Sequence, residues 1–388
     1  MREKHIFCSS SLVEGLKPVM MMLLVQAAYT GMNIFYKMTT EVGMNLTVLV
    51  AYRNMFSAAL MVPAALIIER KSRPKLTLAI LFQAFISGLL GATISQNFYV
   101  QSVALTSTTS ATAITNLVPA ITFVIAICFR LERLALGTHA GRAKAVGTLV
   151  GIGGTMVFTF YKGKEIAIWS KHVNLLHDYT HQNSHVASSH RNTGSQLLGS
   201  FLALGSSTSF ALWLVFQAKV SKTYPSQCHY SNTALMSLMA SIQSVAFALC
   251  RGRDWSQWKL GWDIKLLTAV YAGVVTTGLV FTVIAWCVQM RGPLFVSIFN
   301  PLCFLLVALS GSLFLHEKLY LGSILGGMLI VCGLYMVLWG KNKEMKMMTQ
   351  LPSIRFQDQL RCDNNNTNVA PNALSISNAP TDATRTTN

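Results

Sequence analysis

The sequence predicts an all-α membrane protein with ten transmembrane helices in two inverted five-helix repeats. Of its 388 residues, 52% are hydrophobic and only 12% are charged, whereas soluble domains carry about 25% charged residues. Ten long apolar stretches share a single formal charge, Arg53. The two halves of the chain also match each other at a nearly constant offset. The low share of charged residues argues against a soluble or disordered chain.

The apolar stretches are each long enough for a helix to cross the hydrocarbon core of a bilayer. They do not alternate polar and apolar residues, so a β-barrel is not predicted. The first stretch lacks a small-x-small cleavage site and is interpreted as a signal anchor. The ten spans cover 18–36, 48–68, 78–104, 110–129, 145–161, 197–216, 232–250, 266–290, 294–315 and 319–338.

Basic residues predict the orientation, because cytoplasmic loops are enriched in Lys and Arg. They gather before the first span, in the second and fourth loops, and just after the tenth span. With ten spans, all four places lie on one side, so both termini are predicted to be cytoplasmic. The seventh loop, with Arg251, Arg253, Lys259 and Lys265, is the exception.

An internal repeat relates the halves. At an offset of 185, Gly88 matches Gly273 and Glu132 matches Glu317; at 179, Gly154 matches Gly333. Five spans in each half invert the second half relative to the first, as in many transporters. Compositional similarity between apolar helices is the alternative. The predicted organisation is a cytoplasmic N-terminus (1–17), a first repeat (18–161), a polar non-cytoplasmic loop (162–196), a second repeat (197–340) and a disordered cytoplasmic tail (341–388).

Amides within the spans are candidates for a solute pathway, because polar groups are costly in lipid unless they face protein or water. Gln96, Asn97 and Asn116 lie near the middle of the third and fourth spans, and Asn33 and Asn300 are weaker candidates. Hydrogen bonds that hold the helices together are the alternative.

Arg53 lies about one and a half turns into the second span. The favoured interpretation is an arginine that snorkels to the nearby interface. The alternative is a cation that pairs with a solute carboxylate.

Prolines and helix-end glutamates complete the candidate residues. Pro119 and Pro301 each remove a backbone donor and predict a bend in the fourth and ninth spans. Glu132 and Glu317 end the same two spans and are interpreted as interfacial charge pairs, with a gate as the alternative. Gly147-x-x-x-Gly151 and Gly322-x-x-x-Gly326 predict close helix packing, within one chain or in a homodimer.

Several short runs are similar to those of plant nodulin-21-like, or "Walls Are Thin"-related, transporters of the EamA type in the drug/metabolite transporter superfamily. They are Tyr52-Arg53-Asn54, Pro119-Ala120-Ile121-Thr122-Phe123, Leu131-Glu132-Arg133-Leu134, Trp286-Cys287-Val288-Gln289, Arg291-Gly292-Pro293, Phe299-Asn300-Pro301-Leu302 and the stretch 317–341. This resemblance covers about residues 15–342. It implies ten helices, transport of amino acids, auxin or related small metabolites, and a place in the plasma membrane or the vacuolar membrane.

The predicted function is therefore a facilitator or secondary carrier for small organic solutes, working by alternating access in the lipid bilayer. A non-transporting receptor or scaffold would not need repeat symmetry, and a nucleotide-sugar or phosphate-ester exchanger would want several intramembrane cations. No catalytic motif, metal site or cofactor site is predicted, so the protein is not expected to be an enzyme. Basic residues are spread between apolar runs, which argues against a nucleic-acid partner.

Overall fold

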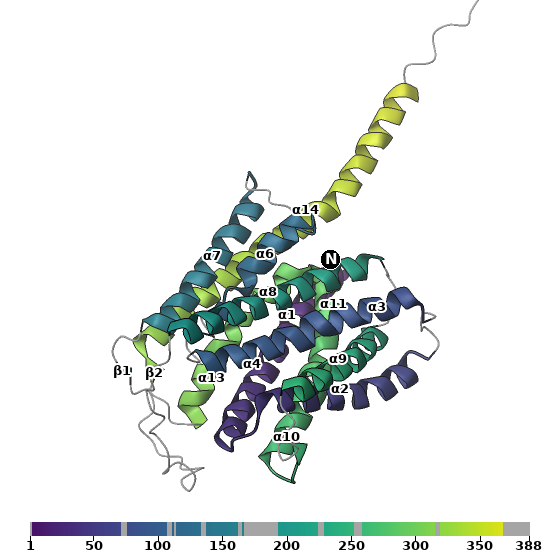
Figure 1. Ribbon diagram of the computed structural model, residues 1–388. Helices are drawn as coiled ribbons and strands as arrows, with labels where there is room; N and C mark the ends of the chain where they lie inside the picture. The colour runs from purple at the N-terminus through teal and green to yellow at the C-terminus, as the bar shows by residue number, and fades with distance from the viewer. Residues whose placement is uncertain are drawn as a thin grey trace, which may run out of the picture. The chain divides into compact units, whose positions relative to one another are not determined.

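The computed structural model describes residues 2–70, 76–106, 111, 114–132, 137–161, 165–166, 193–223, 229–251, 258–314 and 319–367. Among these residues, nine helical segments are long and apolar enough to cross a membrane. They pack side by side in a bundle (Figure 1). The prediction of an all-α, multi-pass membrane protein is thereby confirmed.

The helices are α1 (Arg2–Glu41), α2 (Leu46–Ile68), α3 (Leu78–Gly88), α4 (Ser95–Leu105), α6 (Val118–Cys128), α7 (His139–Phe160), α8 (Thr193–Thr223), α9 (His229–Arg251), α10 (Ile264–Tyr271), α11 (Val280–Arg291), α12 (Pro293–Ser297), α13 (Asn300–Phe314) and α14 (Leu321–Thr367). Side chains cap several N-termini: Asn45 caps α2, Thr77 caps α3 and Thr138 caps α7. Each accepts a hydrogen bond from a backbone N–H that the first turn leaves unpaired.

Two π-helical segments, which the sequence does not predict, interrupt the third and eighth spans. Segment η1 (Leu89–Ile94) joins α3 to α4, and η3 (Ala272–Leu279) joins α10 to α11. In η3 the hydroxyls of Thr276 and Thr277 both donate to the Ala272 carbonyl oxygen, at 2.7 and 3.1 Å. Side-chain bonds to that carbonyl accompany the wider turn, and such segments are frequent at functional sites.

The helix breaks near Pro119 and Pro301, where the sequence predicts a bend. Pro119 lies in the first turn of α6, after a turn at Asn116 and Leu117. Pro301 lies in the first turn of α13, after α12 and a turn at residues 298–299. The first turn of a helix suits proline because the missing N–H has no partner there. Helix α6 is consequently shorter than the predicted span 110–129, part of which lies outside the described residues.

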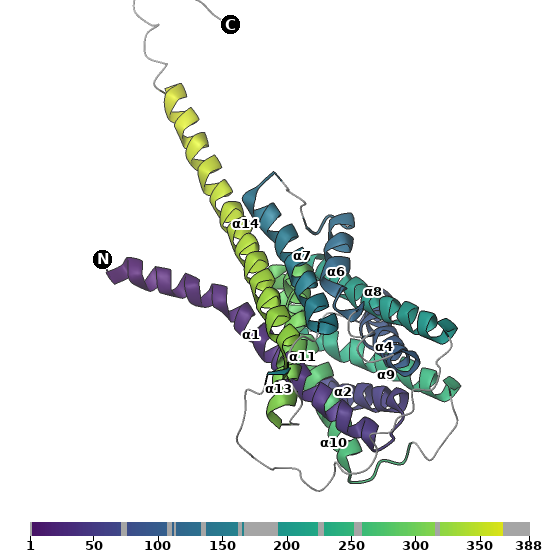
Figure 2. The same cartoon turned by 90° about the vertical axis from the view of Figure 1, so that its left-hand side faces the viewer.

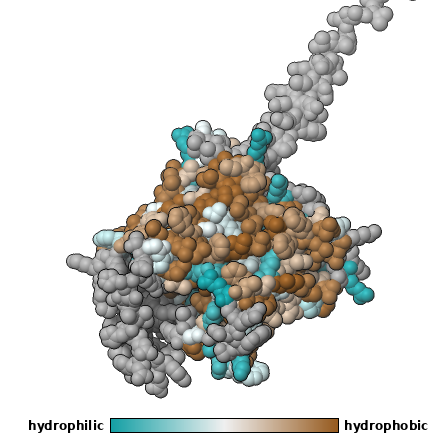
Figure 3. Space-filling view, viewed as in Figure 1, coloured by the Kyte–Doolittle hydropathy of each residue, from teal (hydrophilic) through white to brown (hydrophobic). Residues whose placement is uncertain are grey.

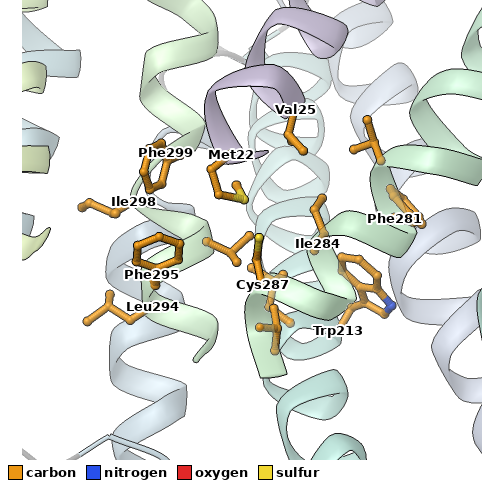
Figure 4. Packing of buried hydrophobic residues seen from close by; sticks show 14 of the residues in the cluster. Met22, Val25, Trp213, Phe281, Ile284, Cys287, Leu294, Phe295, Ile298 and Phe299 are labelled. Carbon is orange, nitrogen blue, oxygen red and sulfur yellow. The ribbon is translucent and has the colours of Figure 1, made fainter. Parts of the chain in front are cut away.

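Many of the close helix pairs join one half of the chain to the other. Helix α2 packs against α9, α1 against α13 and α11, and α8 against α6 and α4 (Figures 1 and 2). The apolar core between the halves includes Met22 of α1, Trp213 of α8, Phe281 of α11 and Phe295 of α12 (Figure 4). Outside, apolar side chains cover much of the visible face (Figure 3), as expected for helices that face lipid.

Helices α7 and α14 pack backbone to backbone through glycine. A Cβ atom on Gly147 would lie 2.9 Å from the Gly333 carbonyl oxygen, and one on Gly154 would lie 2.8 Å from the Ile330 nitrogen. Both glycines must therefore lack a side chain for the helices to approach this closely. The predicted small-residue packing thus occurs within one chain.

Two short segments differ from a purely helical plan. Strand β1 (Glu165–Ile166) pairs antiparallel with β2 (Leu319–Tyr320), with Glu165 opposite Tyr320.

Helix α14 continues to Thr367, inside the stretch 341–388 for which the composition predicts disorder. The chain divides into two compact units at this helix, Met1–Lys341 and Asn342–Asn388. Residues 368–388 and most of the connecting segment 162–196 lie outside the described residues.

Candidate functional site

Arg53 of α2 is enclosed by helices from both halves of the chain. Its side chain is buried, with 1% of the residue exposed. Its Nε donates to Thr277 Oγ1 of η3 at 2.5 Å, and its Nη1 donates to Gln96 Oε1 of α4 at 3.0 Å and to the Tyr36 hydroxyl of α1 at 3.3 Å. The interpretation as a snorkelling arginine is therefore wrong, because neighbouring helices hold the guanidinium inside the bundle.

The second terminal nitrogen of Arg53, Nη2, is buried and has no hydrogen-bond partner among the described residues. No acidic side chain among the described residues forms an ion pair with Arg53 either; its partners are two hydroxyls and one amide. A buried guanidinium prefers a carboxylate or phosphate partner, which it can bind through two parallel hydrogen bonds. The site thus has the chemistry to take one anionic group.

One face of α1 continues the polar site. Asn33 Nδ2 donates to Cys303 Sγ of α13 at 3.5 Å and to the Tyr29 carbonyl oxygen at 2.9 Å. The Thr30 hydroxyl lies 3.9 Å from the same sulfur. Tyr29 interacts electrostatically with Arg53, Tyr36 and Cys303. Asn33 therefore belongs to the same polar region as Arg53, at the contact of α1 with α13.

The other predicted amides have different surroundings. Asn97 donates from Nδ2 to the Thr93 carbonyl oxygen at 2.9 Å, and its Oδ1 has no partner among the described residues. Asn116 is 1% exposed, and both atoms of its amide likewise lack partners within the described part of the chain. Asn300 is half-buried at the start of α13. The structure joins Gln96 directly to Arg53 and does not join these three to it by hydrogen bonds between described residues.

Glu132 forms buried ion pairs with two lysines that the sequence did not predict as its partners. Its carboxylate contacts Lys144 Nζ of α7 at 3.3 Å and also binds Lys341 Nζ of α14. Exposure is 4% for Glu132, 1% for Lys144 and 8% for Lys341. The prediction that Glu132 is part of an interfacial charge pair stays a prediction, but the structure identifies its partners, which are 12 and 209 residues away in sequence. This cluster links the end of the fourth span to the fifth and tenth spans.

Gly292 closes one side of the Glu132 cluster. It has φ of +88°, a conformation that glycine adopts easily, and ends α11 just before α12. A Cβ atom there would lie 3.2 Å from Glu132 Oε1 and 3.5 Å from Lys341 Nζ. The second candidate glutamate, Glu317, and the neighbouring Arg133 lie outside the described residues.

Sequence reasoning missed several residues that the structure places at these sites. Tyr29, Tyr36, Thr277 and Cys303 gave no signal, because such residues are common in membrane helices and their spacing forms no motif. The sequence predicts Lys341 only as one of the basic residues that follow the tenth span. Its position at the end of an apolar span and its match to Lys162 in the repeat were the available cues.

Comparisons with known proteins agree with this architecture. The EamA-like transporter family model matches residues 16–160 and 197–339. The WAT1-related protein At1g25270 of Arabidopsis thaliana is 47% identical over 331 residues, covering 85% of this chain and 91% of that protein. The WAT1-related protein At1g68170 of the same plant is 42% identical over 366 residues, covering 94% and 98%. One solved crystal structure, described only as a protein, has a TM-score of 0.61 at 15% identity, covering 84% of this chain and 98% of that chain, and shares the fold.

Proposed function

Because the chain belongs to the EamA-like transporter family, we propose that it is a facilitative carrier for small organic monocarboxylates, of which auxin is an example. The observation that carries the proposal is the buried Arg53 guanidinium, whose Nη2 has no partner among the described residues. A solute carboxylate would supply the missing acceptor and neutralise the charge. Charge-assisted bonds of this kind are about twice as strong as neutral ones.

The number of charges at the site favours monoanions over two other classes. Nucleotide sugars and phosphate esters carry at least two negative charges, and Arg53 is the one cation that the described residues bring to this site. Zwitterionic amino acids also carry an ammonium group, which seeks an acidic partner. Tyrosine, asparagine, threonine and cysteine provide none. Amino acids are therefore the second candidate class.

Alternating access is the mechanism that this arrangement supports. The family model matches the chain in two ranges of similar length. The two π-helical segments lie at glycines that match in the repeat, since η1 begins directly after Gly88 and η3 contains Gly273 as its second residue. The helix pairs α1–α13 and α8–α6 also correspond. We infer two inverted repeats that rock about the interface where Arg53 lies. A receptor or scaffold would need neither this correspondence nor a buried guanidinium at the interface.

We expect Arg53→Met to lower uptake of indole-3-acetate by at least roughly tenfold, because a hydrogen bond to a charged group contributes about 1.5–3 kcal/mol. Arg53→Lys should lose less, since it keeps the charge but not the planar fork. The measurement is uptake of labelled solute into proteoliposomes that hold the purified chain. Unchanged uptake by both variants would remove Arg53 from the pathway.

The matched control is Gln243→Met. Gln243 of α9 accepts a hydrogen bond from Thr93 and donates to the Phe85 carbonyl oxygen, and neither bond involves a partner of Arg53. The substitution Gln243→Met thus changes a polar side chain of the bundle that is not part of the proposed solute site. Uptake by this variant should stay near that of the natural chain.

We also expect a pH gradient to drive no more solute accumulation in vesicles that hold the chain than in protein-free vesicles, where the protonated acid crosses the lipid unaided. Proton-coupled carriers relay protons through Asp, Glu or His inside the membrane, and the ten predicted spans contain none of the three. The test starts with equal solute on both sides of the vesicle membrane and then imposes the gradient. Accumulation beyond that of protein-free vesicles would contradict a facilitator and direct attention to Glu132 and Glu317.

The remaining proposals concern the cellular setting. The basic flanks favour cytoplasmic termini, and the plasma membrane and the vacuolar membrane both suit the family resemblance. A homodimer remains a prediction, but Gly147 and Gly154 do not support it because they contact α14 of the same chain. We propose a transport role without catalysis.

A further inference from the structure

Gln26 of α1 is a fully buried amide with unmet hydrogen-bonding capacity. None of the residue is exposed, and neither its Nε2 nor its Oε1 has a partner among the described residues. Burial of such an amide costs free energy, because the group loses its hydrogen bonds to water and forms none within the protein. A solute or an ordered water that bonds both atoms would remove that cost.

The face of α1 on which Gln26 lies is the face that meets the polar site. Residues 26, 30 and 33 follow one another at spacings of four and three, so they share one side of the helix. Thr30 donates to the Gln26 carbonyl oxygen at 2.8 Å, and both Thr30 and Asn33 contact Cys303 of α13. Gln26, Thr30 and Asn33 thus form one row of polar side chains along α1, on the side of the helix that faces the polar site.

The other neighbour of Gln26 along this face is apolar. Met22, one turn earlier, packs in the apolar core with Phe295 and Phe299 (Figure 4). Gln26 therefore marks the boundary where the polar row ends and the apolar core begins. A solute held here would meet an apolar wall on one side and a single amide on the other.

Helical geometry relates Gln26 to the Arg53 site along α1. Arg53 interacts electrostatically with Tyr29 and donates a hydrogen bond from Nη1 to the hydroxyl of Tyr36. These residues lie three and ten positions after Gln26, which corresponds to about 4.5 and 15 Å of helical rise. A solute that contacts both Gln26 and Arg53 would therefore lie along this part of α1.

We propose that Gln26 determines specificity by hydrogen-bonding a polar group remote from the solute carboxylate. This inference rests on the proposed function, because Arg53 holds the carboxylate end. The solutes selected are monocarboxylates with an apolar body and a distal N–H or O–H. The amide oxygen of Gln26 accepts from that group, and its nitrogen can donate to an adjacent acceptor.

Two solutes of equal charge and similar size test the proposal. Indole-3-acetate has a ring N–H, and naphthalene-1-acetate has none. The natural chain, reconstituted in proteoliposomes, should prefer indole-3-acetate in kcat/KM. Gln26→Met should lower kcat/KM for indole-3-acetate roughly three- to tenfold and leave that for naphthalene-1-acetate nearly unchanged. The Gln26→Met variant should therefore no longer prefer indole-3-acetate over naphthalene-1-acetate.

Thermal stability and a control variant separate this role from a structural one. Gln26→Met removes an unsatisfied amide, so its apparent Tm should equal or exceed that of the natural chain. Gln243→Met loses two hydrogen bonds, so it should lower Tm and keep the solute preference. Equal losses for both solutes in Gln26→Met, or no change in either, would overturn the proposal while leaving Arg53 as the anchor. Failure of the natural chain to carry either solute would overturn the proposed function as well.

Discussion

Glu132→Gln is expected to destabilise the folded protein by about 3–5 kcal/mol, the usual cost of removing one partner from a buried ion pair. The change leaves the ammonium groups of Lys144 and Lys341 in the interior without the carboxylate that they share. Three spans meet at this cluster, so the loss should affect the whole bundle. Apparent Tm in detergent should fall by several degrees, on the order of 5 °C or more.

Substitutions of the two lysines test whether the loss of stability in Glu132→Gln comes from their unpaired charges. Lys341→Met alone keeps the pair between Glu132 and Lys144, so it should cost less than Glu132→Gln. Adding Lys144→Met and Lys341→Met to Glu132→Gln replaces the buried charges with neutral side chains and should recover most of the Tm. A Glu132→Gln protein as stable as the natural chain would show that these charges are solvated.

Gly273→Ala is expected to damage the fold and the Arg53 site together. A Cβ atom at this position would lie 2.6 Å from the Arg53 carbonyl oxygen and 2.7 Å from Phe56 Cβ. Backbone atoms cannot rotate away, so η3 must move from α2, and the bond between Arg53 and Thr277 is lost. We expect a loss of stability of about 1–3 kcal/mol, and uptake lowered by at least roughly tenfold.

Gly153→Ala is the matched control for this substitution. Gly153 also lies inside a membrane helix, α7, but a Cβ atom there meets nothing within 4 Å. Alanine is favoured over glycine in a helix interior by up to about 1 kcal/mol, so this variant should be at least as stable as the natural chain and should transport normally. If Gly273→Ala matched it in Tm and uptake, the close packing of α2 and η3 would not matter for the site.

The helix breaks show how far local sequence can predict the fold. Each span was visible because crossing a bilayer requires a certain length of apolar chain, which is a property of that segment alone. Pro119 and Pro301 also predicted interruptions of their helices, because the missing backbone N–H of proline is likewise a property of one segment alone. The sequence did not reveal whether each proline bends a helix or starts a new one. The π-helical segments were also missed, since they involve threonine hydroxyls and contacts with another helix.

The candidate site was predictable in part. Arg53 stood out as the single charge in ten apolar spans, and Gln96 and Asn33 stood out as intramembrane amides. Their polarity is a local property. Whether Arg53 turns toward the interface or into the bundle depends on whether other helices offer it partners, and Thr277 lies 224 residues away.

The sequence by itself thus determined the multi-pass membrane class, the order of the apolar segments, and the polar groups that these segments contain. Only the tertiary structure decided which of these groups meet: Arg53 with Tyr36 and Gln96, and Glu132 with Lys341. The physical reason is that hydrophobic length acts within one segment, whereas pairing of buried polar groups depends on which helices become neighbours. That choice rests on close packing at glycines such as Gly154 and Gly273, whose partners no local pattern specifies.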